Sequence, residues 1–155
     1  MDRLKLFLAT GFYSGYFPKA PGTAGTLVGL VIYIFIHLAV PEYAVKINIA
    51  LVLISIYPSI KIGDYAEKFF AKKDPQQVVL DEILGIWTAL MFHPFSWSCV
   101  IAAFFIFRFM DIVKPFPADR LQKLKGGAGI MIDDYIAGVY ANICVTALLY
   151  FKIIS

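Results

Sequence analysis

The stretch GGAGIMIDDYIAG, residues 126–138, places two carboxylates, Asp133 and Asp134, at the start of an apolar segment that continues almost to the last residue. An unpaired charge in an apolar environment costs several kcal/mol or is neutralised by protonation. A helix entering such an environment is therefore expected to keep acidic residues only where a partner compensates them. The nature of that partner is the question that this stretch raises.

Composition places the chain among membrane proteins. Hydrophobic residues make up 60% of the 155 residues and charged residues 16%, and the mean hydropathy is +0.75. Soluble domains are closer to about 45–50% apolar and about 25% charged. A core of this size cannot hide so much apolar surface from water, so we expect lipid to cover part of it. By length, the chain is expected to be one membrane-embedded domain, residues 1–155.

The apolar residues fall into five blocks, at 24–40, 47–62, 78–92, 95–110 and 136–154. No strand-like alternation or hairpin-turn dipeptide competes, so the prediction is an all-α, compact multi-helical membrane protein. A full crossing needs roughly 20 apolar residues and these blocks hold somewhat fewer. We therefore expect about four to five membrane-embedded or re-entrant helices.

Local signals refine three of these segments. Pro58 lies within the second block, where it is expected to kink a helix. His93-Pro94 separates the third block from the fourth, which predicts a helical hairpin. The helix that carries Asp81 and Glu82 is expected to begin near Pro75, because proline favours the first helical turn.

Charge is distributed unevenly if each of the five segments crosses the membrane once. Only Lys46 and Lys152 then lie on one side, together with the acidic residue Glu42. The other twelve of the fourteen basic residues lie opposite: Arg3, Lys5, Lys19, Lys61, Lys68, Lys72, Lys73, Arg108, Lys114, Arg120, Lys123 and Lys125. The positive-inside rule makes that side cytoplasmic. The net charge of +3, without a basic run interleaved with aromatics, indicates no nucleic-acid partner.

Two segments share a pattern of acid and glycine. When VLDEILGIWTAL (79–90) and IDDYIAGVYANI (132–143) are aligned on Gly85 and Gly138, Asp81 matches Asp134, four residues before each glycine. Acid and glycine then share a helical face, and glycine allows close helix approach. Acidic residues also favour first helical turns, which explains either motif alone. The two motifs together predict two helices that cross near their glycines and bring two carboxylates together.

Carboxylates brought together need a cation. Oxygen ligands without a usable His or Cys cluster favour a hard ion, Mg²⁺ before Zn²⁺. His37 and His93 fall on the opposite side in the expected topology, and Cys99 and Cys144 lie in apolar runs without metal-binding spacing.

Two further segments carry polar residues at expected helix ends. In FRFMDIVKPFP (107–117), Arg108 and Asp111 are three apart and can share a face, and Pro115 favours an extended exit at Lys114. This arrangement suits an anion beside a metal ion, although for this segment taken alone a juxtamembrane anchor to lipid headgroups is the favoured explanation.

The second segment, YSGYFPKAPGTAGT (13–26), leads into a helix whose first N–H groups can face a phosphate. The segment is not a P-loop, because it lacks the G-K-[ST] ending. Thr23 or Thr26 can contact the phosphate or simply cap the helix.

In order along the chain, SGYFPKAPGTAGT, DPxxVVLDEILG, FRFMDIVKPFP and GGAGIMIDDYIAG resemble the phosphatidylglycerophosphatase A family, from about Ser14 to Gly138. The resemblance implies a Mg²⁺-dependent lipid phosphatase of the inner membrane that hydrolyses phosphatidylglycerophosphate to phosphatidylglycerol and phosphate, a step toward cardiolipin. It marks Thr23 and Thr26 as phosphate contacts, and as further site residues Asp81, Glu82, Asp111, Lys114, Asp133 and Asp134. Which carboxylates bind metal and which handle protons is not implied.

The leading hypothesis is therefore an enzyme whose active site faces the cytoplasm from a multi-pass membrane domain. Mg²⁺ would be held by Asp81, Asp111 and Asp134, and Glu82 or Asp133 would act as base. Lys114 and Arg108 would stabilise the transition-state charge.

Two alternatives remain open. A small ion-binding transporter would line a pathway with the same acids, although they gather at one face. Another lipid phosphotransfer enzyme is the second alternative, although the D-G-x-x-A-R signature of alcohol phosphotransferases is missing. The sequence leaves the oligomeric state open.

Overall fold

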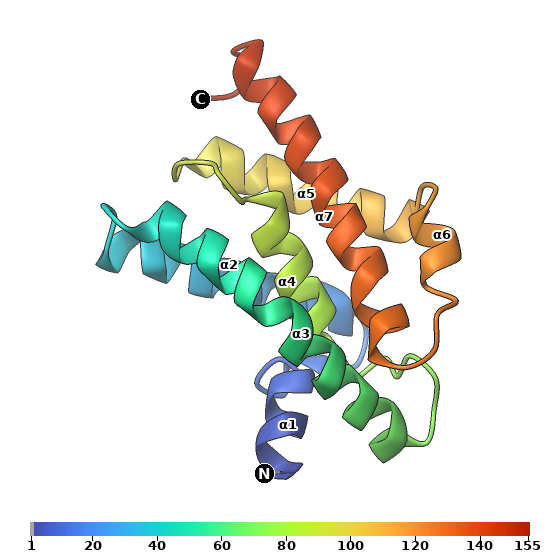
Figure 1. Ribbon diagram of the computed structural model, residues 1–155. Helices are drawn as coiled ribbons and strands as arrows, with labels where there is room; N and C mark the ends of the chain where they lie inside the picture. The colour runs from blue at the N-terminus through green and yellow to red at the C-terminus, as the bar shows by residue number, and fades with distance from the viewer. Residues whose placement is uncertain (1) are drawn as a thin grey trace.

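The computed structural model describes residues 2–155, and all regular secondary structure in that range is helical (Figure 1). The all-α prediction is thus confirmed. The elements are α1 (Asp2–Ala9), the 3-10 turn η1 (Ser14–Tyr16), α2 (Pro21–Ala39), α3 (Ala44–Phe70), α4 (Leu80–Ala89), α5 (Trp97–Val113), α6 (Ala118–Leu121) and α7 (Gly127–Tyr150).

The short helix α4 is the centre of the fold. It packs against α2, α3, α5 and α7, and it lies between them in Figure 1. Ile86, Ala89 and Leu90 are completely buried, and they form one core with Phe107 of α5 and Ala141 of α7. Because α4 is covered on all sides, its two acidic residues are fixed relative to every neighbouring helix.

Glycines set the helix crossings. A Cβ atom on Gly138 would lie 2.5 Å from the carbonyl oxygen of Gly85, so α4 and α7 touch through their backbones. A Cβ atom on Gly85 would lie 3.1 Å from the carbonyl oxygen of Asp134. The prediction that these two helices cross near their glycines is confirmed.

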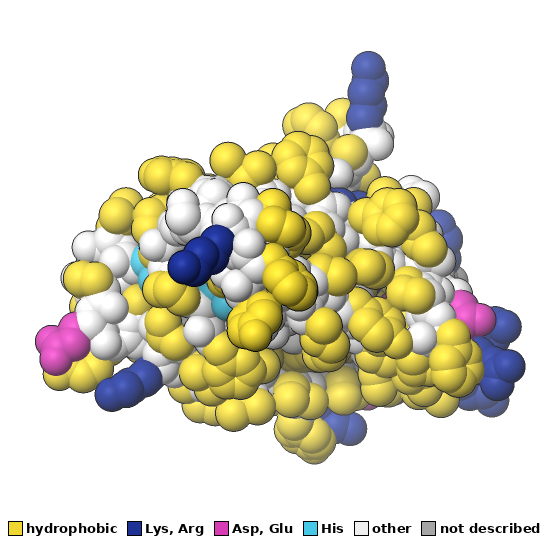
Figure 2. Space-filling view, turned by 90° about the horizontal axis from the view of Figure 1, so that it is seen from above, with side chains coloured by type: hydrophobic (Ala, Val, Ile, Leu, Met, Phe, Trp, Pro, Cys, Tyr) yellow, Lys and Arg dark blue, Asp and Glu magenta, His cyan; other side chains and the backbone are white. Residues whose placement is uncertain are grey.

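Three helices, α2, α3 and α7, are long and apolar enough to cross a membrane. Large hydrophobic side chains are exposed on each of them, such as Phe35, Ile54 and Tyr150. Figure 2 shows hydrophobic side chains over most of one face, with the charged ones mainly near its edges. Such a surface is unfavourable in water and favourable in lipid, so the chain is a membrane protein.

The expectation that each segment crosses the membrane once is wrong for α4. Its 10 residues extend only roughly 15 Å, about half the thickness of a bilayer core. The His93-Pro94 break does produce the expected hairpin, because α4 and α5 lie on either side of it and pack together. The first turn of α4 and the end of α5 therefore face the same part of the molecule.

One predicted helix start is wrong. The helix with Asp81 begins at Leu80 and not near Pro75, because the Val78 N–H bonds to the Pro75 carbonyl in a turn and the Val79 N–H bonds to Ala9 of α1. The last helix begins at Gly127, well before its apolar block. There Oδ1 of Asp64 accepts the Gly127 N–H at 2.8 Å and so caps the first turn.

Candidate active site

A polar cavity of about 640 Å³ lies where four helix ends meet. The first turns of α2 and α4 contribute to it, together with the end of α5 and the second turn of α7. Among its lining residues are Lys19, Gly22, Thr23, Asp74, Asp81, Glu82, Arg108, Asp111, Lys114, Asp133 and Asp134. Four chain segments that are far apart in sequence thus supply one site.

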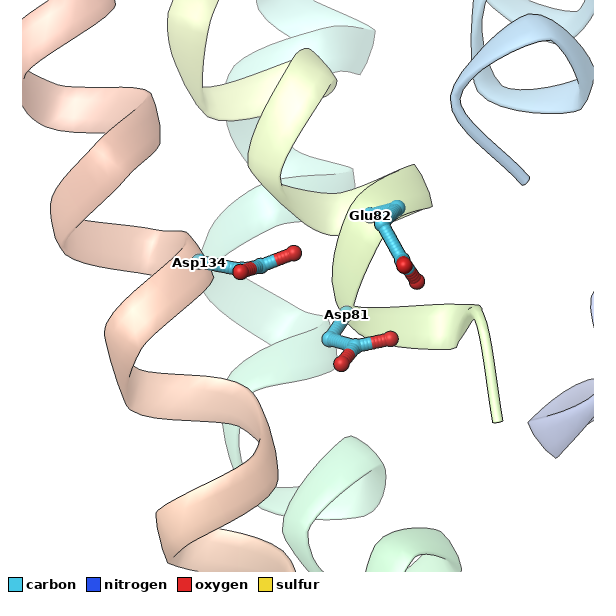
Figure 3. A group of neighbouring side chains, drawn as sticks. All are labelled: Asp81, Glu82 and Asp134. Carbon is cyan, nitrogen blue, oxygen red and sulfur yellow. The ribbon is translucent and has the colours of Figure 1, made fainter. Parts of the chain in front are cut away.

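Three carboxylates converge inside this cavity. Asp81 and Glu82 lie in the first turn of α4, where the positive end of the helix dipole favours acidic residues. Asp134 extends toward them from α7 across the glycine contact (Figure 3). One oxygen from each of Asp81, Glu82 and Asp134 lies within 4.8 Å of the other two.

Two basic residues are held beside this group by ion pairs. An Arg108 nitrogen lies 2.8 Å from Oδ2 of Asp111, so the expectation that these two residues share a face of α5 is confirmed. Lys114 ends α5 in the left-handed region, at φ 47°, and its ammonium donates to Oδ2 of Asp133. The helix thus ends at Lys114 as predicted, but the expected extended conformation is wrong, because Lys114 adopts the left-handed conformation that closes the helix. Both cations are partly buried and face the cavity.

The start of α2 forms another wall of the cavity. Pro21 is the first residue of the helix, and the N–H groups of Gly22 and Thr23 lie in the first turn, where no intrahelical acceptor is available. Thr23 lines the cavity. Thr26 does not line it, because its hydroxyl is buried, donates to the Gly22 carbonyl at 2.9 Å, and lies 3.5 Å from Arg108. Thr26 therefore contacts Arg108 and not the cavity itself.

The position of Gly22 links this wall to the acids. A Cβ atom at that position would meet the carboxylate of Glu82, and it would lie 3.1 Å from the guanidinium of Arg108. Glycine at this position thus lets the start of α2 approach the acidic group directly. A larger residue would occupy the space between the helix N-terminus and the carboxylates.

Burial shapes the ionisation of the acids on α4. It raises the pKa of Asp81 well above its ordinary value, and the charges of Glu82 and Asp134 raise it further. Burial also raises the pKa of Glu82, although the charge of Arg108 opposes the shift. A cation between these groups would favour their charged forms.

Lys114 shows the opposite balance. Burial by itself would lower its pKa, but the hydrogen bond and the charge of Asp133 raise it above the ordinary value. Lys114 is therefore a cation at neutral pH.

The residues present fit a divalent ion. Oδ1 of Asp81, Oε2 of Glu82 and Oδ2 of Asp134 are buried, and within residues 2–155 they have no hydrogen-bond partner. Buried carboxylate oxygens without partners are costly, and an ion removes that cost. An all-oxygen ligand set is typical of Mg²⁺.

The predicted third ligand, Asp111, lines the same cavity, but one of its oxygens is paired with Arg108. Its role as a metal ligand stays a prediction. Glu82, one of the two expected bases, lies in the three-carboxylate group, and its role as a base stays a prediction.

Sequence reasoning named no role for Lys19, Gly22 or Asp74, yet all three line the cavity. Each lies inside one of the four motifs that carry the family resemblance, so the position within those motifs is the available signal. The two histidines lie elsewhere. His37 bonds to the carbonyl of Tyr33, and His93 lies 3.2 Å from the side chain of Asn142.

A family model described as phosphatidylglycerophosphatase A matches residues 7–149. The chain belongs to the phosphatidylglycerophosphatase A family. The family assigns it to the lipid phosphatases, enzymes that act on phospholipid in a membrane. The apolar surface of the fold agrees with that assignment.

Two relatives carry the family name. The phosphatidylglycerophosphatase A of Haemophilus influenzae is 36% identical over 94% of this chain and 89% of its own length. That of Escherichia coli is 35% identical over 97% of this chain and 87% of its own length.

A Bacteroides thetaiotaomicron protein named "Putative phosphatidylinositol-3-phosphatase" is 40% identical over 92% of this chain and 91% of its own length. No solved structure was found to match the chain. The relatives thus agree on removal of a phosphate from a lipid headgroup but differ in the headgroup that they name.

Proposed function

We propose that this phosphatidylglycerophosphatase A family member is a Mg²⁺-dependent enzyme that hydrolyses phosphatidylglycerophosphate to phosphatidylglycerol and phosphate at the cytoplasmic face of the cell's inner membrane. One observation carries the proposal: a single cavity holds a three-carboxylate group beside two partly buried cations, Arg108 and Lys114. Carboxylates hold the metal ion and cations bind the phosphate, which are the two requirements of phosphoryl transfer. The names of two relatives support the choice of lipid.

The terminal phosphate would bind between α2 and α5. Arg108 and Lys114 are each held by a carboxylate, yet guanidinium has five N–H donors and ammonium three, so donors remain for a phosphate. The N–H groups of Gly22 and Thr23 add the positive end of the α2 dipole. Because Asp111 and Asp133 fix these cations beforehand, little reorganisation is needed when charge builds up in the transition state.

The metal would be held by Asp81, Glu82 and Asp134, with Asp111 beside them. Mg²⁺, when bound, neutralises phosphate oxygens and lowers the pKa of coordinated water.

Asp133 is suited to accept the proton of the attacking water. Its Oδ2 accepts from Lys114, whereas its Oδ1 has no hydrogen-bond partner within residues 2–155. In the reaction, the water oxygen bonds to phosphorus and its proton passes to the carboxylate. The bond from phosphorus to the glycerol oxygen breaks, and that oxygen takes a proton from solvent to become a hydroxyl. Lys114 holds the carboxylate in place for this transfer.

The cytoplasmic orientation is supported by the positions of Lys46 and Lys152, the two basic residues that are expected on the opposite side of the membrane from the other twelve. Lys46 is in the first turn of α3, roughly 26 Å along that helix from Gly63. Gly63 packs against Gly127 at the start of α7, which is the end of α7 near the candidate active site. Lys152 follows the end of α7, whose last residue is roughly 24 Å from Asp134. Basic residues are thus sparse at the ends that lie far from the site, as the positive-inside rule requires.

A second headgroup is favoured by the Bacteroides relative, which is named for phosphatidylinositol-3-phosphate. Both lipids present a phosphate monoester beyond a phosphodiester, so the same cavity chemistry applies to either. The two headgroups differ in bulk and hydroxyl pattern, and turnover of each lipid decides between them.

The test is phosphate release by purified protein from each lipid in detergent, with Mg²⁺ or with a chelator. We expect Mg²⁺-dependent release, and we expect Asp81→Asn and Asp134→Asn to lower it at least about 100-fold, the cost of losing a key electrostatic partner. Asp2→Asn is the matched control, because Asp2 is exposed and lies outside the cavity. Full Mg²⁺-dependent activity in both site variants would show that the assignment is wrong.

A further inference from the structure

An apolar groove lies beside the candidate active site. It runs between η1 and the first two turns of α2, with a volume of about 450 Å³. Residues that line it include Tyr13, Tyr16, Phe17, Pro18, Leu27 and Val28. Neither the ion nor the phosphate of the proposed reaction uses this groove.

The groove adjoins the catalytic cavity. Pro18 lines both, and on α2 the first residues, Pro21 to Thr23, line the cavity whereas Ala24, Leu27 and Val28 line the groove. Ala24 and Val28 follow Pro21 by only roughly 5 and 10 Å along the helix axis. An extended molecule could therefore occupy both spaces at once.

The groove also opens where lipid is expected. Helix α2 is a candidate membrane span, and the groove follows its first turns, at the end that meets the cavity. Tyr16 and Phe17 on the rim are at least half exposed, as is Leu27. Aromatic side chains gather at membrane interfaces, between headgroups and chains. The position of the groove along α2 thus matches the acyl-chain region of a lipid whose headgroup phosphate lies in the cavity.

Lys19 stands at the junction. It lines the cavity, directly follows Pro18, and is exposed. Within residues 2–155 its ammonium takes part in no ion pair, unlike Arg108 and Lys114. A phospholipid with a terminal phosphate monoester carries a second anion, the phosphodiester, between that phosphate and its acyl chains. Lys19 lies where this second anion would pass.

We propose that the groove beside α2 seats an acyl chain of the lipid substrate, and that Lys19 binds its phosphodiester. This inference rests on the proposed function, because it needs a lipid whose terminal phosphate is in the cavity. The acyl-chain site and the Lys19 contact lie on one path along the lipid. The phosphate monoester binds between α2 and α5, the phosphodiester lies at Lys19, and the acyl chain runs along Leu27 and Val28. The groove then makes the enzyme selective for long-chain lipid over soluble phosphate esters.

A second apolar groove provides a control. It lies between α5 and α7, has a volume of about 650 Å³, and is lined by residues such as Phe105, Cys144 and Leu148. None of its lining residues lines the catalytic cavity. On α5 its residues Phe109 and Met110 are next to Arg108 and Asp111 of the cavity in sequence, whereas on α7 Leu148 is roughly 21 Å along the helix from Asp134.

The experiment fills each groove in turn. Leu27→Trp and Val28→Trp narrow the groove beside α2, and Leu148→Trp makes the matching change in the control groove. KM and kcat are measured with long-chain phosphatidylglycerophosphate in mixed micelles and with its water-soluble dibutanoyl analogue. We expect both α2 variants to raise KM for the long-chain lipid about tenfold relative to the analogue. Leu148→Trp leaves that ratio unchanged.

The phosphodiester part is tested with Lys19→Gln. Phosphatidate has a phosphate monoester and acyl chains but no phosphodiester, so the variant is expected to raise KM for phosphatidylglycerophosphate about tenfold relative to phosphatidate. Lys19→Arg is expected to return the ratio of the two KM values most of the way to that of the wild-type protein.

Equal KM ratios in Leu27→Trp, Val28→Trp and Leu148→Trp would overturn the acyl-chain site. Equal effects of Lys19→Gln on the two lipids would overturn the role of Lys19. In either case the wild-type protein still releases phosphate from these lipids. If the proposed function itself is wrong, the wild-type protein releases no phosphate from any of these substrates. Thermal unfolding of each variant with and without Mg²⁺ identifies a loss that is due to misfolding.

Discussion

Replacing Gly138 with alanine tests whether the crossing of α4 and α7 assembles the site. The new Cβ atom would lie 2.5 Å from the Gly85 carbonyl oxygen and 2.8 Å from Cβ of Thr88, whereas ordinary contact begins at 3.4 Å. Both neighbours belong to α4, and the first is backbone, which cannot rotate away. The helices must therefore separate by roughly 0.9 Å at this point, the difference between 2.5 and 3.4 Å.

The substitution has two opposing effects on stability and a separate effect on activity. Overpacking of a well-packed contact costs about 1–3 kcal/mol, whereas alanine in a helix interior is favoured over glycine by about 1 kcal/mol. Stability is therefore expected to change little or to fall modestly. Activity is more sensitive, because Asp134 and Asp81 lie one helical turn from the contact and a displacement of about 1 Å can cost about 100-fold. We expect kcat/KM to fall about 10- to 100-fold.

The assay is Mg²⁺-dependent phosphate release at several Mg²⁺ concentrations, together with thermal unfolding in the same detergent. Val139→Ala serves as control, because Val139 is the next residue of α7 and is 46% exposed. Gly138→Ala protein with wild-type kcat/KM and a raised melting temperature would show that the crossing has room for the methyl group and that this prediction is wrong.

Three further predictions concern the ion, the acids and the phosphate. Removing Mg²⁺ with a chelator should lower the melting temperature by roughly 5–10 °C, because an ion at about 100 times its Kd stabilises the fold by about 2.7 kcal/mol. In metal-free protein the melting temperature should fall as pH rises from about 3.8 through the raised pKa of Asp81, because over that range the folded state binds more protons than the unfolded state. Arg108→Lys should raise KM about tenfold in the phosphate-release assay, because lysine lacks the planar donors with which Arg108 pairs with Asp111.

Each of these predictions has a clear contrary outcome. A melting temperature that is indifferent to chelator would show that the acids are compensated without an ion. A metal-free protein whose stability rises with pH would mean that the buried acids are ionised in ion pairs, and Asp81→Asn should flatten the predicted slope. Wild-type KM in Arg108→Lys would place the phosphate away from α5.

The positions of Asp81 and Asp134 could be predicted because the signal is local. An acid four residues before a glycine fixes both on one helical face, and a close helix crossing needs the two glycines to meet. The Arg108–Asp111 pair was predictable for the same reason, since a spacing of three is short range on a helix.

Apart from this crossing, contacts between distant segments could not be predicted. Lys114 pairs with Asp133 across a separation of nineteen residues, and this contact depends on how α5 and α7 cross. Gly22 approaches Glu82 because α2 packs on α4. The start of α4 at Leu80 likewise depends on a tertiary hydrogen bond from Val79 to Ala9. No periodicity within one segment contains this information.

The most direct test of the account is a measurement of divalent ion binding by the purified protein in detergent. Mn²⁺, which accepts the same oxygen ligands, can be followed by electron paramagnetic resonance and displaced by Mg²⁺. The account predicts that Mn²⁺ binds tightly to the wild-type chain and at least about tenfold more weakly to both Asp81→Asn and Asp134→Asn. Binding that is absent in the wild-type protein, or equally tight in both variants, would contradict the claim that these helices meet to hold an ion.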